Sequence, residues 1–406
     1  MWLERRREFF HDLKVHRVRA ALTLVAIAWG TISVVLLLSF GEGLGDRLLN
    51  GEMNAGNRIM IVYGGETGLA FEGLAKGRRV RLAEDDIDLI RETIPGIEMA
   101  SPQYRAGVTL TCGKSSATTE CEGVNSAFEE MRRMYPVLGG RFLNEIDVVE
   151  RRRTLVLGSE IAKELFQSAD PIGKTVLLDG TPFILVGIIQ NKLQTSMNNG
   201  PDSRRAIIPY TTLRTMYGRM TVNSLVVRPA DPEKQEFIKA QLYRVLGRKY
   251  KFDAADERAL GIWDFIEDEK IGRKINLGMA IFLGSVGCLT LLIAGVGVAN
   301  VMYVVVKERT QEIGIKLAVG ARRRYILAQF IFESLLIAFI GGAIGLLVSW
   351  GVISVVWLFP ADDGPMQFLG RPILSATVML ATTTILALIG LLAGLFGREQ
   401  VHHRHG

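Results

Sequence analysis

The stretch AALTLVAIAWGTISVVLLLSF, Ala20–Phe40, decides the class of fold because none of its 21 residues is charged. A helix of about 20 apolar residues crosses the hydrocarbon core of a membrane, which is about 30 Å thick. Three further apolar runs follow after a long polar interval. We therefore expect an integral membrane protein with four transmembrane α-helices, at residues 20–40, 277–306, 329–359 and 373–396.

The first run is expected to be a retained anchor. Its apolar core is too long for a cleavable signal peptide, and no small-x-small cleavage site follows before Gly41. Basic residues precede it and gather again between the second and third runs, whereas the short loop 360–372 carries two aspartates against one arginine. Because Lys and Arg accumulate on the cytoplasmic side, we expect both termini to be cytoplasmic and residues 41–276 to lie outside.

The outside region 41–276 is predicted to be a large α+β domain. Short apolar stretches such as NRIMIVYG (57–64) and NSLVVRPA (223–230) are typical of strands. Apolar residues at helical spacing predict helices within 83–96 and 233–248, and KTVLLDGTPFILVGIIQ (174–190) predicts a hairpin that turns at Asp179-Gly180. Strands and helices therefore alternate along this domain.

Composition argues against several kinds of site. The five histidines are at 11, 16, 402, 403 and 405, so the outside region has none for a metal site or a Ser-His pair. We expect no metal site and no catalytic residue. The formal net charge of +6 is concentrated beside the apolar runs, where it meets anionic lipid, and it predicts no nucleic-acid partner.

Two cysteines, Cys112 and Cys121, lie in a predicted hairpin of the outside region. A two-residue turn at Ser116-Ala117 would place them opposite each other. The sequence leaves two alternatives open, a structural disulfide in an oxidising compartment or two free thiols.

The tripeptide Gly173-Lys174-Thr175 has the ending of a phosphate-binding loop but not its beginning. Ser168 stands where the first glycine should be, and Pro171 removes one of the backbone amides that would bind phosphate. We interpret the segment as a turn between two strands.

Four further features lie in or beside the apolar runs. Residues 1–19 place Trp2, Phe9 and Leu13 on one face and predict a cytoplasmic amphipathic elbow helix. The second run, 277–306, is longer than a span needs, which predicts a stalk projecting outward, with simple tilt as the alternative. The pairs Gly341/Gly345 and Gly390/Gly394 predict close helix contacts. Glu333, near the inner end of its span, predicts a structural contact with the preceding loop rather than a proton relay.

Between the second and third runs lies KERTQEIGIKLAVGARRRYILAQF, Lys307–Phe330. Glu308, Glu312 and Lys316 share one face of a predicted short helix, in which Glu312 can pair with Lys316. Ile313, Leu317 and Ala321 line another face, and Gly320 is a natural C-cap. A solvated loop with a charged face is the simpler alternative on composition alone.

This segment resembles the signature of the permeases of the macrolide-exporter (MacB-like) and FtsX-like family of ABC transporters, which is roughly E-R-x-x-E-I-G-I-x-x-A-x-G-A. FESLLIAFIGGAIG (332–345), LTLVAIAWGTISVVLLLSFGEG (22–43) and residues 153–189 are also similar to that family. The resemblance covers nearly the whole chain. It implies that residues 307–328 contain a cytoplasmic coupling helix, with the contacts to an ATPase made by Glu308, Arg309, Glu312, Ile313, Lys316, Leu317 and Gly320.

The resemblance also implies the partners. We expect an ABC ATPase on a separate chain, which would hold ATP and magnesium, and a second permease copy or paralogue in a dimer. A periplasmic adaptor and an outer-membrane duct are further expected partners. The implied location is the bacterial cytoplasmic (inner) membrane, and the implied function is export by mechanotransmission. An FtsX-like regulator that signals to a periplasmic partner without transporting cargo is the alternative.

Overall fold

The computed structural model describes residues 17–166, 171–194, 200–218, 220–320, 322–359 and 369–402. The chain forms two compact units, residues 1–47 with 274–406 and residues 48–273. The boundary falls inside the helices α2 (Arg17–Ala55) and α9 (Phe265–Glu308). The predicted elbow helix at 1–19 lies almost wholly outside the described residues.

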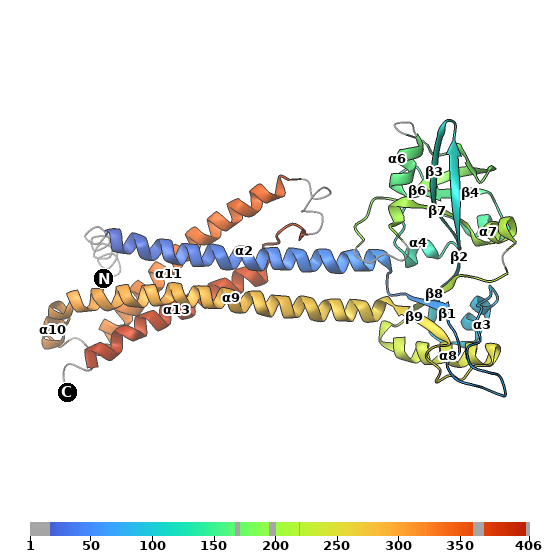
Figure 1. Ribbon diagram of the computed structural model, residues 1–406. Coiled ribbons are helices and arrows are strands. Elements are labelled where there is room, and N and C mark those ends of the chain that lie inside the picture. Colours follow the sequence, from blue (N-terminus) through green and yellow to red (C-terminus); the bar gives the residue numbers. More distant parts are fainter. Residues whose placement is uncertain are drawn as a thin grey trace. The chain divides into compact units, whose positions relative to one another are not determined.

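The first unit contains the apolar helices. It comprises most of α2 and of α9, together with α10 (Thr310–Ala318), α11 (Arg323–Trp357) and α13 (Ala376–His402) (Figure 1). Three stretches are long and apolar enough to cross a membrane, Ala21–Gly51, Phe265–Glu308 and Arg324–Trp357, and Ala376–Leu392 is a shorter apolar helix. The prediction of a four-span membrane protein is confirmed. α2 and α9, with 39 and 44 residues, are both longer than one span requires.

Glycines allow α11 to approach its neighbours closely. A Cβ added at Gly341 would lie 2.8 Å from the Cβ of Ile27, and one at Gly345 would lie 2.6 Å from the Cβ of Thr31, both on α2. One at Gly390 on α13 would lie 3.0 Å from a methyl carbon of Leu335. The predicted close contacts at Gly341, Gly345 and Gly390 are therefore present, as expected where small residues let helix backbones meet.

The second unit is an α+β domain, and one of its two sheets is a four-stranded antiparallel sheet. Its strand order is β2-β8-β1-β9, and each of its two helices connects a pair of its strands. This is the ferredoxin-like arrangement of two split βαβ units. β1 alternates between two apolar clusters, because Met60 and Val62 face one and Ile61 faces the other. The elements are β1 (Met60–Gly64), α3 (Asp86–Thr93), β2 (Ile97–Cys112), β8 (Ser224–Pro229), α8 (Gln235–Tyr250) and β9 (Leu260–Asp264).

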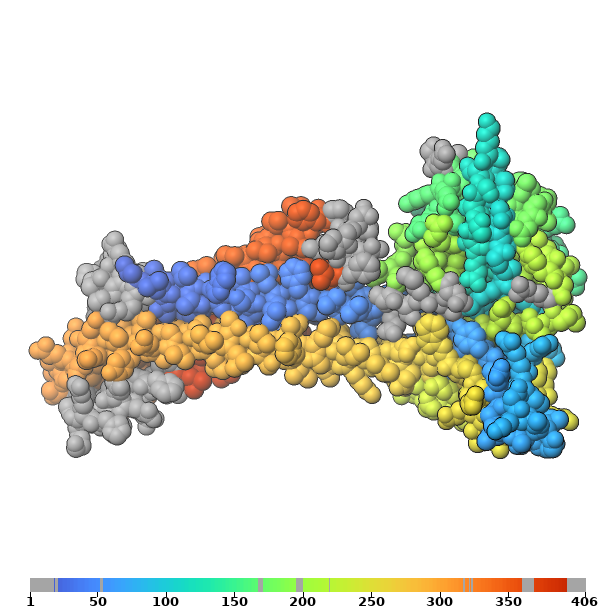
Figure 2. Space-filling view, in the orientation of Figure 1, coloured from blue at the N-terminus to red at the C-terminus, as the bar shows by residue number. Residues whose placement is uncertain are grey.

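A closed ring of six strands is inserted between β2 and β8. The second half of β2 pairs with β3 and with β5, and the ring continues through β7, β4 and β6. β2 therefore belongs to both sheets, and it forms with β3 a long hairpin whose tip projects beyond the rest of this unit in Figure 2. The ring elements are β3 (Ser115–Val124), α4 (Phe128–Met131), α5 (Glu145–Val149), β4 (Thr154–Leu157), α6 (Ser159–Phe166), β5 (Thr175–Leu178), β6 (Thr181–Ile188), η1 (Asp202–Arg204), β7 (Arg205–Pro209) and α7 (Tyr210–Tyr217).

The register of the β2–β3 hairpin corrects the expectation for the cysteines. The turn falls at Gly113-Lys114 rather than at Ser116-Ala117, because Cys112 pairs with Ser115. Cys121 pairs instead with Ala106, and both thiols are free. A glycine with φ +60° at position 113 lets the chain reverse three residues earlier than predicted.

The Gly-Lys-Thr segment is a turn, but it leads from a helix into a strand. It lies between α6 and β5, not between two strands. The Gly173 N–H donates to the Leu185 carbonyl at 2.7 Å, so this amide is already used inside the fold. The hairpin predicted at Asp179-Gly180 is confirmed, since Leu178 pairs with Thr181.

Candidate functional site

The segment that joins α9 to α11 forms the short helix α10, and hydrogen bonds bridge the junction with α9. The Arg309 N–H donates to the Val305 carbonyl at 3.1 Å, and the Ile313 N–H donates to the Arg309 carbonyl at 3.0 Å. The Thr310 hydroxyl donates to the Val306 carbonyl at 3.1 Å. The last turn of α9 and the first turn of α10 are thus tied together by backbone bonds.

Ile313 holds α10 against the neighbouring helices. Its side chain is 8% exposed and belongs to an apolar cluster that includes Val306 of α9 and Phe330 of α11. Full burial of a side chain of this size contributes about 1.5–3 kcal/mol. Ile313 is therefore a packing residue at the base of α10.

An ion pair forms a second link across the same junction. Arg309 Nη1 lies 3.5 Å from Glu333 Oε1 on α11, with both side chains mostly buried. The Gln329 Nε2 donates to the same carboxylate oxygen at 3.2 Å. The structure places Glu333 in contact with the segment before its own helix, where a carboxylate at the end of a span obtains a partner.

The far end of α10 is closed by Gly320. This glycine has φ +97°, a left-handed conformation that glycine adopts without steric cost at a helix C-terminus. In this last turn the Val319 N–H donates a hydrogen bond to the Ile315 carbonyl oxygen at 3.1 Å. The helix therefore ends where the sequence pattern placed its cap.

The outward surface of α10 is mixed in character. Glu308, Glu312 and Lys316 are exposed, and no described contact joins the Glu312 carboxylate to the Lys316 ammonium. Ile315 is 60% exposed and Val319 is 84% exposed. The two apolar side chains are four residues apart on one helix face, a spacing that makes them neighbours.

The exposed residues of α10 are only partly the same as the ATPase-contact residues that were predicted from the sequence. Ile313 points into the helix cluster, and Arg309 is engaged with Glu333, so both build the support beneath α10. The Leu317 side chain lies outside the described residues. Sequence reasoning missed Ile315 and Val319, although their i, i+4 spacing was a signal that could have identified them.

Comparison with known protein families accounts for both units. Residues 20–245 match the MacB-like periplasmic core domain, and residues 284–399 match the FtsX-like permease C-terminal domain. The second match contains α10, α11 and the part of α9 from residue 284 onward.

The chain belongs to the MacB-like permease family of ABC transporters.

Curated relatives agree with this assignment. The chain is 26% identical over 406 residues to the macrolide export ATP-binding/permease protein MacB of Bdellovibrio bacteriovorus, covering 99% of this chain and 61% of the relative. It is 30% identical over 349 residues to the protein of the same name from Wolinella succinogenes, covering 86% of this chain and 52% of the relative. This MacB-like permease thus spans between half and two thirds of the length of these relatives.

Solved structures of related domains are more distant. The periplasmic region of MacB from Actinobacillus actinomycetemcomitans is 19% identical, with a TM-score of 0.44, and covers 55% of this chain and 96% of that one. The family match and the apolar helices describe an inner-membrane permease with an extracytoplasmic α+β domain.

Proposed function

We propose that this MacB-like permease transmits the energy of ATP hydrolysis from a partner ABC ATPase to its periplasmic domain, and that it thereby exports cargo. In this proposal α10 is the docking helix for the ATPase. The proposal rests mainly on one observation: α10 is fixed to both neighbouring helices while its outer face stays exposed.

The contacts that hold α10 in place are those that a force-transmitting helix requires. Ile313 ties α10 to α9 and α11 by apolar packing, and the Arg309–Glu333 ion pair ties the start of α10 to α11. A push on a loosely held segment would be lost in local motion, whereas a packed interface moves as a unit. Displacement of α10 is therefore passed to two long helices.

The exposed face of α10 suits a protein partner. It combines the apolar side chains Ile315 and Val319 with the charged side chains Glu312 and Lys316. Interfaces commonly surround an apolar centre with a polar rim. For this face to meet an ATPase, both termini and α10 must be cytoplasmic, as the distribution of basic residues predicts.

The proposed ATP-driven movement, called here the stroke, involves two copies of the permease, or one copy and a paralogue. Closure of two ATPase subunits around ATP and magnesium would move the two docking helices and, through α9 and α2, the outer domains. Cargo of a drug, peptide or lipid-like kind would be handled outside the membrane, with a periplasmic adaptor and an outer-membrane duct as further partners. The FtsX-like alternative uses the same stroke to activate a periplasmic partner.

An affinity pull-down tests the docking helix. The full chain is recovered from native membranes in mild detergent, and co-purifying P-loop ATPase is measured for the native chain, Glu312→Lys and Ile315→Glu. We expect recovery with the native chain and a loss of about tenfold or more with each variant, since the core residues of an interface contribute most of its binding energy. Lys114→Glu, at the tip of the β2–β3 hairpin, is the matched surface control and should leave recovery unchanged.

Failure to recover an ATPase with any of these chains would overturn the docking role of α10. The two functional alternatives are then separated by ATPase activity. An exporter should show stimulation of ATP hydrolysis by its cargo, tested with a panel of macrolides, peptides and lipids. A regulator should show none with any of them and should respond only to its periplasmic partner.

A further inference from the structure

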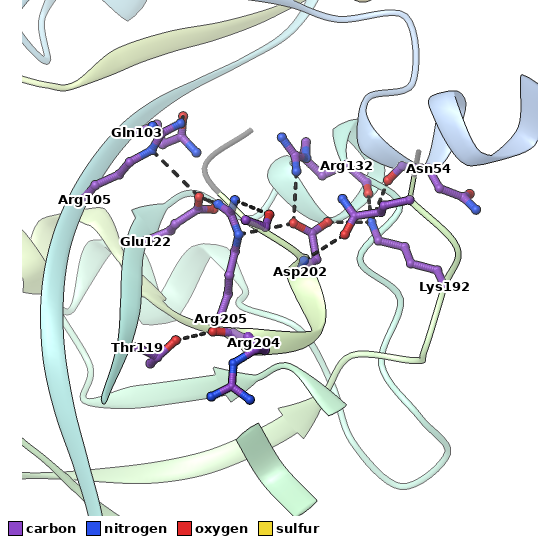
Figure 3. Close-up of polar contacts among 12 residues, drawn as sticks. Asn54, Gln103, Arg105, Thr119, Glu122, Arg132, Lys192, Asp202, Arg204 and Arg205 are labelled. Carbon is purple, nitrogen blue, oxygen red and sulfur yellow. Dashed lines mark hydrogen bonds and ion pairs between the residues drawn. The ribbon is translucent and has the colours of Figure 1, made fainter. Parts of the chain in front are cut away.

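The end of α2 is held by the six-stranded ring through two reciprocal contacts. Lys192, on the segment between β6 and η1, donates from its amine to the Asn54 carbonyl at 2.8 Å. The Asn54 side-chain amide donates in the other direction, to the Leu193 carbonyl at 3.0 Å. These two contacts are called here the α2 clamp, and Figure 3 shows Asn54 and Lys192 side by side at the end of α2. The helix is thus attached to a segment 138 positions further along the chain.

Lys192 is itself held inside the ring. Its amine also donates to the Arg132 carbonyl at the end of α4, and it lies 2.9 Å from Asp202 Oδ2. Asp202 in turn accepts from Arg132 Nη2 at 3.0 Å. The side chains of Arg132 and Asp202 are buried, and that of Lys192 is 11% exposed. A long side chain whose amine is fixed at several acceptors has little rotational freedom left, so the ring resists a displacement of the Asn54 carbonyl.

A main-chain bond and apolar packing extend the same attachment. The Asn57 N–H, two residues after α2, donates to the Met131 carbonyl of α4 at 2.9 Å. Ala55, the last residue of α2, is fully buried in an apolar cluster that includes Phe128 and Met131 of α4. Close-packed contacts of this kind transmit a displacement. The ring therefore contacts the chain at residues 54, 55 and 57, where α2 ends.

The start of α9 is held by the four-stranded sheet and its helix α8. Asp264, the last residue of β9, caps the first turn of α9 and lies 2.7 Å from Lys239 Nζ on α8. Gln235 Nε2 of α8 donates to Glu267 of α9 at 3.0 Å. Within the described part of the chain, no hydrogen bond or ion pair joins residues 265–273 to the ring. Polar contacts thus tie the ring to α2, and the four-stranded sheet to α9.

β2 passes between these two halves of the second unit. Gln103 pairs with β8 in the four-stranded sheet, and the next residue, Tyr104, pairs with β3 in the ring. Ala55 of α2 and Phe265 of α9 lie in one apolar cluster that contains residues of both halves. Apolar packing is non-directional and accommodates a small rotation, whereas hydrogen bonds require set distances and angles. A rotation of the ring about β2 is therefore the motion that the α2 clamp controls.

We propose that Lys192 is a positioning residue that makes the ring follow the end of α2, while the four-stranded sheet follows α9. A change in the placement of α2 against α9 then rotates the ring relative to the sheet. The use of this rotation in transport rests on the proposed function, because the stroke reaches the second unit through these two helices. The clamp itself depends on neither ATP nor a partner.

Distances between spin labels test the proposal in the full chain, in mild detergent. Three exposed positions take the labels: Leu48 on α2, Ile146 on α5 in the ring, and Phe237 on α8 beside the four-stranded sheet. Each is changed to cysteine in a background of Cys112→Ser and Cys288→Ala, in which Cys121 is fully buried and does not react. Double electron–electron resonance measures the 48–146 and 48–237 distances. Labelled chain is diluted with excess unlabelled chain, so that only labels within one chain are measured.

Loss of the clamp should release the ring and leave the sheet in place. We expect the 48–146 distance distribution to become about twice as wide with Lys192→Met, which removes the amine, and to widen less with Asn54→Ala, which removes only the side-chain amide. The 48–237 distribution should stay unchanged in both variants. Lys163→Met, at an exposed lysine on α6, is the matched control and should leave both distributions unchanged. With the ATPase partner present, Lys192→Met should retain ATP hydrolysis and lower the export obtained for each ATP.

A native 48–146 distribution in both variants would overturn the proposal. Equal widening of the two distributions would also overturn it, because Lys192 would then stabilise the second unit as a whole rather than position the ring. Asn54→Ala leaves the buried charged side chains intact, so it decides the outcome if Lys192→Met does not fold. The distances are measured without an ATPase. A failed pull-down therefore leaves the clamp in place, and a failed distance test leaves the docking role of α10 in place.

Discussion

Arg309 and Glu333 form an ion pair that links the junction of α9 and α10 to α11, with 3.5 Å between Nη1 and Oε1. The two residues are 24 positions apart in the sequence: Arg309 lies between α9 and α10, and Glu333 lies on α11. Together with Ile313 they connect the exposed helix α10 to the apolar helices behind it. In the proposed mechanism, the strength of that connection determines how completely a displacement of α10 reaches the outer domain.

A double-mutant cycle measures this ion pair. Arg309→Gln, Glu333→Gln and the double variant are compared by thermal unfolding of the full chain in mild detergent. We expect a coupling energy of about 1 kcal/mol, because the pair is partly buried but not closely spaced. The same variants should retain binding to the ATPase while lowering the fraction of ATP hydrolysis that produces export. Additive effects of the two single changes would contradict a direct interaction.

Ile313 and Ile315 provide a matched comparison on one helix. Ile313→Ala opens a cavity in the apolar cluster and should destabilise the first unit by about 2–4 kcal/mol. Ile315→Ala removes a side chain that is 60% exposed and should change stability by less than about 0.5 kcal/mol. In the pull-down we expect the opposite order. Ile315→Ala should reduce ATPase recovery more than Ile313→Ala does, because Ile315 lies on the proposed docking face. Equal loss of stability in both variants would mean that α10 is buried on both faces.

The contact of α11 with α2 should tolerate no side chain at Gly345. A Cβ there would lie 2.6 Å from the Thr31 Cβ and 2.9 Å from the Ala28 carbonyl oxygen, so Gly345→Leu must separate the helices. We expect a loss of about 1–3 kcal/mol, seen as a lower unfolding temperature of the full chain. Gly351→Leu is the control on the same helix, because a Cβ at Gly351 meets nothing within 4 Å. A similar fall in both variants would point to a general effect of leucine.

Lys192 should make the second unit more stable as the pH rises from about 8 to about 10. Burial lowers the pKa of Lys192 in the folded chain to about 8, below its ordinary value of 10.5. Between these values the unfolded chain binds the proton and the folded chain does not, so the free energy of unfolding increases with pH. The full gain is about 3 kcal/mol, at about 1.4 kcal/mol for each pKa unit.

The measurement is urea unfolding of the full chain, followed by tryptophan fluorescence, at several values of pH. The stability difference between the native chain and Lys192→Met isolates the effect of this one amine from that of other titrating groups. Lys239 and Lys249 do not interfere in this range, because ion pairs raise their pKa above the ordinary value. A difference that stays constant from pH 7 to pH 10 would show that Lys192 titrates normally.

Much of this fold could be predicted from local patterns. Runs of uncharged residues such as Ala20–Phe40 predict membrane helices, because about 20 apolar residues are long enough to cross the hydrocarbon core as a helix. Period-two alternation and turn residues predicted β1, β8 and the hairpin at Asp179-Gly180. The wrong predictions concerned the register of one hairpin and the elements on either side of one turn. The β2–β3 turn was placed three residues late, and the Gly-Lys-Thr turn was assigned to the wrong pair of elements, since turn position depends on pairing across strands.

The sequence alone determined that this chain crosses the membrane, that its outer region mixes strands and helices, and that Gly320 is suited to cap a short helix, because each depends on neighbours along the chain. The tertiary structure alone decided that β2 belongs to two sheets, that Ile313 points inward while Ile315 points outward, and that Arg132, Lys192 and Asp202 meet in the interior. Those residues lie up to 70 positions apart in the sequence. Their contacts follow from the closure of the ring, which brings distant strands together by long-range pairing that no local pattern encodes.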